Sequence, residues 1–142
     1  MRNRKITLRQ AVSFHGHLGP YLVIGLLMGE YALKKIKARP HLGLEVKVYG
    51  AVNKPKSCLI DGLQLSTGCT YGKGNITKFD GKIIRADFIN RNNKKSIQLA
   101  LKPEIVKQVQ AADNHYLSEK LARELYNKAP GALFKVTLRN LL

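Results

Sequence analysis

The sequence predicts an α+β domain in which a mostly antiparallel sheet packs against a long buried helix and further helices. Three observations predict it. The first half of the segment 20–37 is apolar on nearly every side, as in a helix buried centrally or at a subunit interface. Alternating apolar and polar residues predict strands in the middle of the chain, and helical patterns occur near both ends. The 142 residues, 44% hydrophobic and 24% charged, fit a single domain over 1–142.

The N-terminal elements follow from capping and proline signals. Thr7 and Gln10 have the spacing of a capping box, which predicts a short helix ending near Phe14. Pro20 suits the first turn of the long helix, whose end we expect at about Lys37 because a proline follows soon after. The alternation over 44–49 then predicts a strand with one face inward.

The middle of the chain is predicted to contain a helix, a loop and a hairpin. Ser57 can cap a short helix that runs to about Ser66, and 67–75 form a glycine-rich loop. The apolar runs on either side of Asp80-Gly81 give the strongest hairpin signal in the sequence. Four more elements are expected in the C-terminal part: a strand at 96–101, helices at 103–111 and 118–129, and a last strand at 134–138.

The charge of the chain is strongly positive. Twenty-five Lys and Arg face nine Asp and Glu, a net charge of +16 that would attract polyanions. The positive residues are spread along the chain without a series of aromatic residues or a nucleic-acid motif. A solvated basic surface is the plainer interpretation. A basic binding module for an anionic coenzyme or nucleic acid is the alternative.

Targeting signals are not evident. No apolar run reaches the roughly 18–20 residues that would cross a bilayer. The basic N-terminus is not followed by an apolar stretch with a cleavage site. We therefore expect a cytoplasmic protein without a membrane partner. The two cysteines lack a C-x-x-C spacing, so neither a zinc ribbon nor a disulfide follows from the sequence.

Two imidazoles stand where the long helix begins. His15 and His17 lie in a Phe-His-Gly-His-Leu-Gly-Pro segment. Neutral histidine is a good ligand for zinc and other transition metals, and a helix N-terminus offers unpaired N–H groups to an anion. Taken alone, an H-x-H pair is more often capping or hydrogen-bonded within the fold.

Two further segments carry reactive groups. On the helix after Ser57, Cys58 neighbours Asp61, and Asp61 neighbours Gln64, because residues three apart share a face. A thiol beside a carboxylate can serve as a metal ligand, although a buried small residue is the alternative. In the glycine-rich loop, which includes Cys69, the glycines allow close approach of a ligand and Lys73 supplies a positive charge. A tight structural loop is equally compatible with that pattern.

Together these segments resemble the FmdE-like family of formylmethanofuran dehydrogenase subunits. In that family a phenylalanine–histidine–glycine–histidine segment opens a long helix, and a later segment reads roughly C-x-x-D-x-x-Q-x-x-x-G-C-T-x-G-K-G-N. Cys58 through Asn75 match the later segment throughout, and the resemblance covers about 5–90. In many relatives the first motif carries a cysteine after its second histidine, in the form H-x-C-P, and this chain has Gly19 at that position. No cysteine follows Cys69, so the zinc finger of some relatives is not expected.

The resemblance implies a metal-binding accessory protein or small enzyme of one-carbon metabolism. The protein would act in methanogenesis and would associate with the molybdenum or tungsten formylmethanofuran dehydrogenase. It would be a basic protein of archaeal type and a homodimer. The chain lacks cysteine clusters for iron–sulfur centres, so an independent dehydrogenase is not expected. The implied cofactor is a divalent metal, zinc first. The implied site residues are His17, Cys58, His15 and Cys69 as metal ligands, Asp61 and Cys58 in catalysis, and Gln64, Lys73 and Asn75 in substrate binding.

Overall fold

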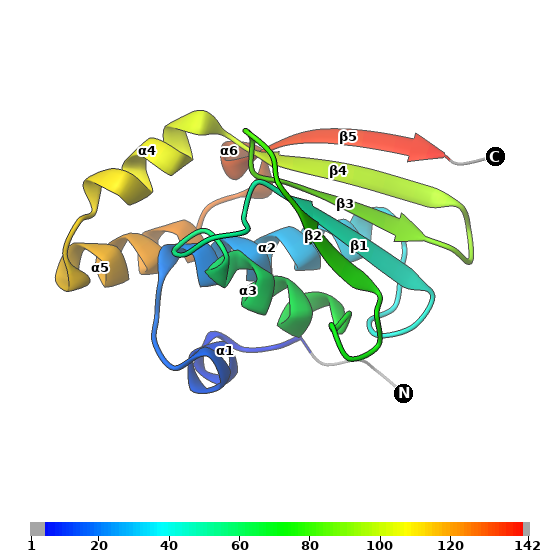
Figure 1. Cartoon of the computed structure of the whole chain (residues 1–142), viewed down its shortest axis with the longest axis horizontal. Helices are drawn as coiled ribbons and strands as arrows, with labels where there is room; N and C mark the ends of the chain where they lie inside the picture. Colours follow the sequence, from blue (N-terminus) through cyan, green and yellow to red (C-terminus); the bar gives the residue numbers. More distant parts are fainter. Residues whose placement is uncertain (1–4, 141–142) are drawn as a thin grey trace.

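The structure, a computed structural model that describes residues 5–140, is a five-stranded sheet with helices packed on it (Figure 1). The strand order is β2-β1-β3-β4-β5. Every pairing is antiparallel except β1 with β2, so the predicted α+β class with a mostly antiparallel sheet is confirmed. The elements are α1 (Leu8–His15), α2 (Pro20–Lys35), β1 (Leu44–Tyr49), α3 (Cys58–Thr67), β2 (Ile76–Phe79), β3 (Arg85–Asn90), β4 (Lys95–Leu101), α4 (Pro103–Ala111), α5 (His115–Tyr126), α6 (Pro130–Leu133) and β5 (Phe134–Asn140).

Helix α2 forms the centre of the core, as its apolar sequence predicts. It runs beneath the sheet with α3 on one side and α5 on another (Figure 1). Leu22, Ile24 and Met28 are fully buried, and the inward residues of β1 and β3, such as Val46 and Phe88, belong to the buried core as well. None of the helices among residues 5–140 is long and apolar enough to cross a membrane.

The predicted hairpin at Asp80-Gly81 is wrong. Strand β2 pairs in parallel with β1, with Val46 opposite Ile76, and β3 lies on the other side of β1. The reason is the crossover helix α3, which brings the chain back parallel to β1, as in a βαβ unit. Strand β1 therefore lies between β2 and β3, and the Asp-Gly turn connects two strands that do not pair with each other.

The backbones of α2 and α3 approach each other at a pair of glycines. A Cβ at Gly25 would lie 2.1 Å from the carbonyl oxygen of Leu59, and a Cβ at Gly62 would lie 2.3 Å from that of Leu22. The Ser66 hydroxyl donates to the Gly62 carbonyl at 2.8 Å, and it also lies 3.2 Å from that of Gly25. This contact sets the position of α3, and with it the side chains at the start of α3.

Helix starts were predicted with mixed success. The capping box at α1 is confirmed, since Gln10 N–H donates to the Thr7 hydroxyl at 3.1 Å and Thr7 N–H donates to the Gln10 side chain at 2.9 Å. Helix α3 begins after Ser57, but the Ser57 side chain makes no cap hydrogen bond because its backbone is already helical. Helix α5 begins three residues before the predicted Ser118, because the Asn114 side chain accepts the Leu117 N–H.

Candidate functional site

The most distinctive polar contact joins the end of α1 to the start of α3. His15 Nδ1 lies 2.6 Å from Asp61 Oδ2, and only 9% of the His15 side chain is exposed. Helix α1 ends at His15 because Gly16, with φ of 105°, takes the left-handed conformation that glycine tolerates and turns the chain toward α2. Two residues 46 positions apart thus form a part-buried hydrogen-bonded pair.

The second ring nitrogen of His15 has no partner among the described residues. This atom, Nε2, is buried. A neutral His15 that donates its Nδ1–H to Asp61 keeps a lone pair on Nε2. The ring of His17 lies alongside, with 4.6 Å between the two ring centroids, and His17 is exposed. The structure thus places His15 beside both Asp61 and His17. Their predicted roles in metal binding and catalysis stay predictions.

Cys58 and Tyr71 lie near enough to Asp61 for its charge to act on both groups. Burial raises the pKa of the Cys58 thiol, and the charge of Asp61 adds to the increase while Lys54 opposes it. Burial also raises the pKa of Tyr71, again with a contribution from Asp61. We name His15, His17, Cys58, Asp61 and Tyr71 the histidine cluster. The sequence analysis did not single out Tyr71. It could have been noticed as the single aromatic residue of the glycine-rich loop.

The structure does not bring Cys69 into the histidine cluster. Cys58 begins α3 and Cys69 follows its end, so a helix of about 15 Å separates them. Cys69 is fully buried, its Sγ lies 3.6 Å from the carbonyl oxygen of Leu44, and burial is the main cause of its raised thiol pKa. The predicted four-ligand set is therefore corrected to a group without Cys69.

The predicted substrate-binding residues hold the glycine-rich loop together. Asn75 Oδ1 accepts the Thr70 N–H at 2.9 Å, and Asn75 Nδ2 donates to the His41 carbonyl. Lys73 Nζ donates to the carbonyl of Gly68, and Gln64 Oε1 accepts the Tyr71 N–H. Gln64, Lys73 and Asn75 thus shape the loop that presents Tyr71. Their contact with a substrate stays a prediction.

The histidine cluster contains an imidazole oriented by a carboxylate, as in many metal sites, but it lacks a full set of ligands among the residues that the structure describes. His15 shows the carboxylate-supported imidazole with a bare Nε2 that metal ligands usually have. Over residues 5–140, however, no three His, Cys, Asp or Glu side chains are arranged to hold a metal ion. A Cβ at Gly19 would lie 3.3 Å from His17 Nε2, so a larger residue at this position would contact the His17 ring. Two imidazoles alone would leave a metal ion in need of further donors.

The two thiols should differ sharply in reactivity. With iodoacetamide at about pH 8, we expect Cys58 to be modified slowly and Cys69 not at all in the folded protein, because burial excludes the reagent and both raised pKa values lower the thiolate fraction. Mass spectrometry of intact protein would count the adducts. A Cys58→Ser variant that still acquires an adduct without denaturant would contradict the burial of Cys69.

Comparison with known proteins agrees with the fold and the motifs. An α+β domain with a histidine–aspartate pair that joins the end of α1 to the start of α3 is the class that the geometry defines. The model of the family described as "FmdE, Molybdenum formylmethanofuran dehydrogenase operon" matches residues 14–140, and the chain belongs to this family. The resemblance seen in the sequence is thereby confirmed, as is a link to the formylmethanofuran dehydrogenase operon.

Two individual proteins are similar to the chain. A protein of Archaeoglobus fulgidus described as a "Probable S-adenosyl-L-methionine-binding protein" is 29% identical over 128 residues, which are 85% of this chain and 31% of that protein. The chain thus spans about a third of the length of this curated relative. The crystal structure of a tungsten formylmethanofuran dehydrogenase FmdE-like protein from Syntrophus aciditrophicus superposes with a TM-score of 0.67 at 22% identity, covering 95% of this chain and 71% of that one. That likeness supports the fold.

Proposed function

We propose that this chain is a metal-binding accessory protein, or a small enzyme, of formylmethanofuran-linked one-carbon metabolism. In this proposal His15 Nε2 and His17 bind a divalent metal ion, with zinc as the leading candidate. The observation that carries it is the buried, unpartnered Nε2 of an imidazole whose Nδ1 is hydrogen-bonded to Asp61. Such a carboxylate partner fixes the tautomer and makes the ligand nitrogen more basic.

The other residues of the histidine cluster have roles that follow from their positions. Asp61 orients His15, and its negative charge favours a cation nearby. The thiol of Cys58 and the hydroxyl of Tyr71 lie within the influence of the same carboxylate and are the groups that would contact a ligand bound beside the metal. A bound zinc ion would supply Lewis-acid chemistry and lower the pKa of a coordinated water.

Metal titration of tag-free protein tests this proposal. We expect cobalt(II) or zinc to bind at about one ion per chain, and a His15→Ala variant to lose at least tenfold in affinity because it loses a direct ligand. His41→Ala is the matched control, since His41 is exposed and lies outside the histidine cluster. The absence of stoichiometric metal in the wild type, or equal affinity in both variants, would refute the assignment.

Two partners belong to the same proposal. The family description supports a link to the operon, and from it we infer association with the molybdenum or tungsten formylmethanofuran dehydrogenase. A homodimer would suit a site with only two imidazoles, because a second copy can contribute further donors. Light scattering on purified protein, with and without zinc, would report the mass in solution.

The alternative of a basic binding module has weaker support. On the outward-facing side of the sheet, positive side chains occur beside acidic ones: Arg85 pairs with Asp87 at 3.0 Å, and Arg91 pairs with Glu45. Such neutralised pairs are a poor surface for a polyanion. Tight, salt-sensitive binding of a single-stranded oligonucleotide at about 50 mM salt would favour this alternative over the metal site.

A further inference from the structure

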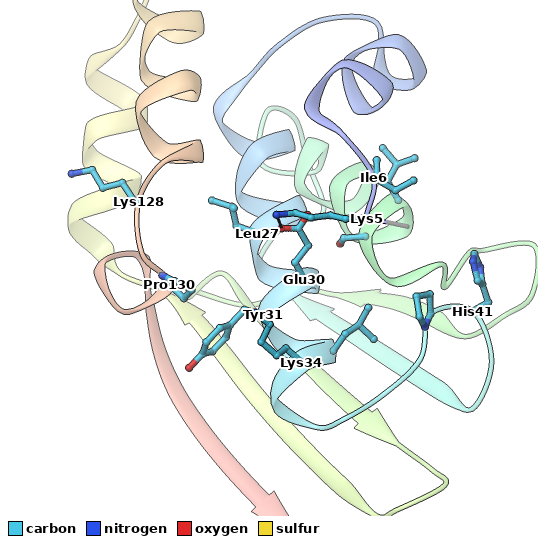
Figure 2. Close-up of a pocket in the computed structure, with 13 residues that line it drawn as sticks. Lys5, Ile6, Leu27, Glu30, Tyr31, Lys34, His41, Lys128 and Pro130 are labelled. Atoms are coloured by element: carbon cyan, nitrogen blue, oxygen red, sulfur yellow. Dashed lines mark ion pairs between the residues drawn. The ribbon is translucent and has the colours of Figure 1, made fainter. Parts of the chain in front are cut away.

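A cavity lies over the C-terminal half of α2. Its volume is about 440 Å³, within the range of small-molecule sites. Figure 2 shows it running across α2, between the N-terminal segment and the turn that follows α5. None of the residues of the histidine cluster lines it. Glu30, near its centre, is ten residues from the start of α2, about 15 Å along the helix axis.

Glu30 brings an unsatisfied acceptor to this cavity. Its Oε1 lies 3.3 Å from Lys5 Nζ, the ion pair drawn in Figure 2, but its Oε2 is buried and has no partner among the described residues. Burial outweighs the nearby lysines and raises the pKa of this carboxyl group. A buried carboxylate oxygen without a donor is costly, so a ligand that donates a hydrogen bond there would be stabilised.

The remainder of the lining combines positive charge with apolar surface. Lys5 and Lys34 lie close enough to Glu30 for their charges to act on its carboxylate, and Lys128 lines the side of the cavity near the end of α5 (Figure 2). Neither Lys34 nor Lys128 forms an ion pair within residues 5–140. Leu27 and the ring of Tyr31 contribute apolar surface from α2 (Figure 2). A ligand that complements this cavity has an apolar body, an acidic group for the lysines and a donor group for Glu30.

We propose that the cavity over α2 binds a small zwitterion: a molecule with an apolar body, an ammonium group that donates to Glu30, and an acidic group that pairs with Lys34 or Lys128. The acceptor and the unpaired lysines flank the same apolar surface, so one compact molecule can satisfy both. This site is independent of the metal site, and each can fail without the other.

Three probes that share a phenylethyl body test the proposal: L-phenylalanine has both charges, phenethylamine only the ammonium, and 3-phenylpropionate only the carboxylate. Binding would be followed by amide chemical shifts of α2 at concentrations up to roughly 20 mM. We expect L-phenylalanine to bind about tenfold more tightly than either single-charge probe, since each lost charge removes a charge-assisted hydrogen bond.

Two variants test which side chains of the cavity recognise the ammonium group and the carboxylate of the ligand. Glu30→Gln should abolish the preference of L-phenylalanine over 3-phenylpropionate, and Lys34→Met combined with Lys128→Met should abolish its preference over phenethylamine. Glu104→Gln and Lys107→Met, at exposed positions on α4, are the matched controls and should change neither preference. No shifts of α2 with any probe, equal affinities for all three, or preferences that persist in the variants would overturn the proposal.

Discussion

Replacing Gly25 with alanine is expected to lower the free energy of unfolding by at least about 3 kcal/mol, or to prevent folding. The new methyl group would lie 2.1 Å from the carbonyl oxygen of Leu59, which belongs to the backbone of α3 and cannot rotate away. The two helices would have to separate, and α3 would lose its packing on the centre of the core. Urea denaturation followed by circular dichroism measures the change.

Gly131→Ala is the control for this substitution. A Cβ at Gly131 meets nothing within 4 Å, and the residue is exposed in α6. We expect its effect to stay within about 1 kcal/mol, the size of the helix-propensity difference. If Gly25→Ala were as mild as Gly131→Ala, the close contact between α2 and α3 would be wrong, and with it the position of Asp61.

Replacing Asp61 with asparagine is expected to weaken metal binding by about 10- to 100-fold while the protein stays folded. The amide can still accept a hydrogen bond from His15 Nδ1, but it lacks the negative charge that makes the imidazole a stronger ligand and favours a cation nearby. Competition between the protein and a chromophoric chelator for zinc would give the two affinities.

Asp80→Asn removes the same charge from an exposed position beyond β2 and should leave the affinity unchanged within about twofold. Should Asp61→Asn bind zinc as tightly as Asp80→Asn, the carboxylate would have no role in metal binding. His15 and Asp61 would then be a structural contact between α1 and α3.

Short-range patterns predicted most of the helices and strands. The apolar sequence of α2, the alternation in β1 and the capping box of Thr7 are local signals, and all three elements formed where they were expected. Where a cap was misjudged, the cause was also local: Asn114 competes with Ser118 for the start of α5, and both have the side chain of a capping residue.

The pairing of strands that are far apart in the chain could not be predicted from the sequence. Asp80-Gly81 has the composition of a hairpin turn, yet β1 lies between the strands it connects. The competing partner for β2 is 30 residues earlier in the chain, since Val46 pairs with Ile76, and its position depends on how α3 packs. The dipeptide Asp80-Gly81 does not indicate whether another strand lies between the two strands that it connects.

The sequence by itself determined the α+β class, the family, and the histidines, aspartate and Cys58 of the candidate site, because these depend on local periodicity and on motifs of fixed spacing. Only the tertiary structure decided that Cys69 lies apart from them, that Tyr71 lies near enough to Asp61 to feel its charge, and that Glu30 lines a cavity with one carboxylate oxygen buried. These three outcomes follow from the direction and packing of α3 and α2. The packing is governed by contacts between residues far apart in the chain, above all the close approach at Gly25 and Gly62.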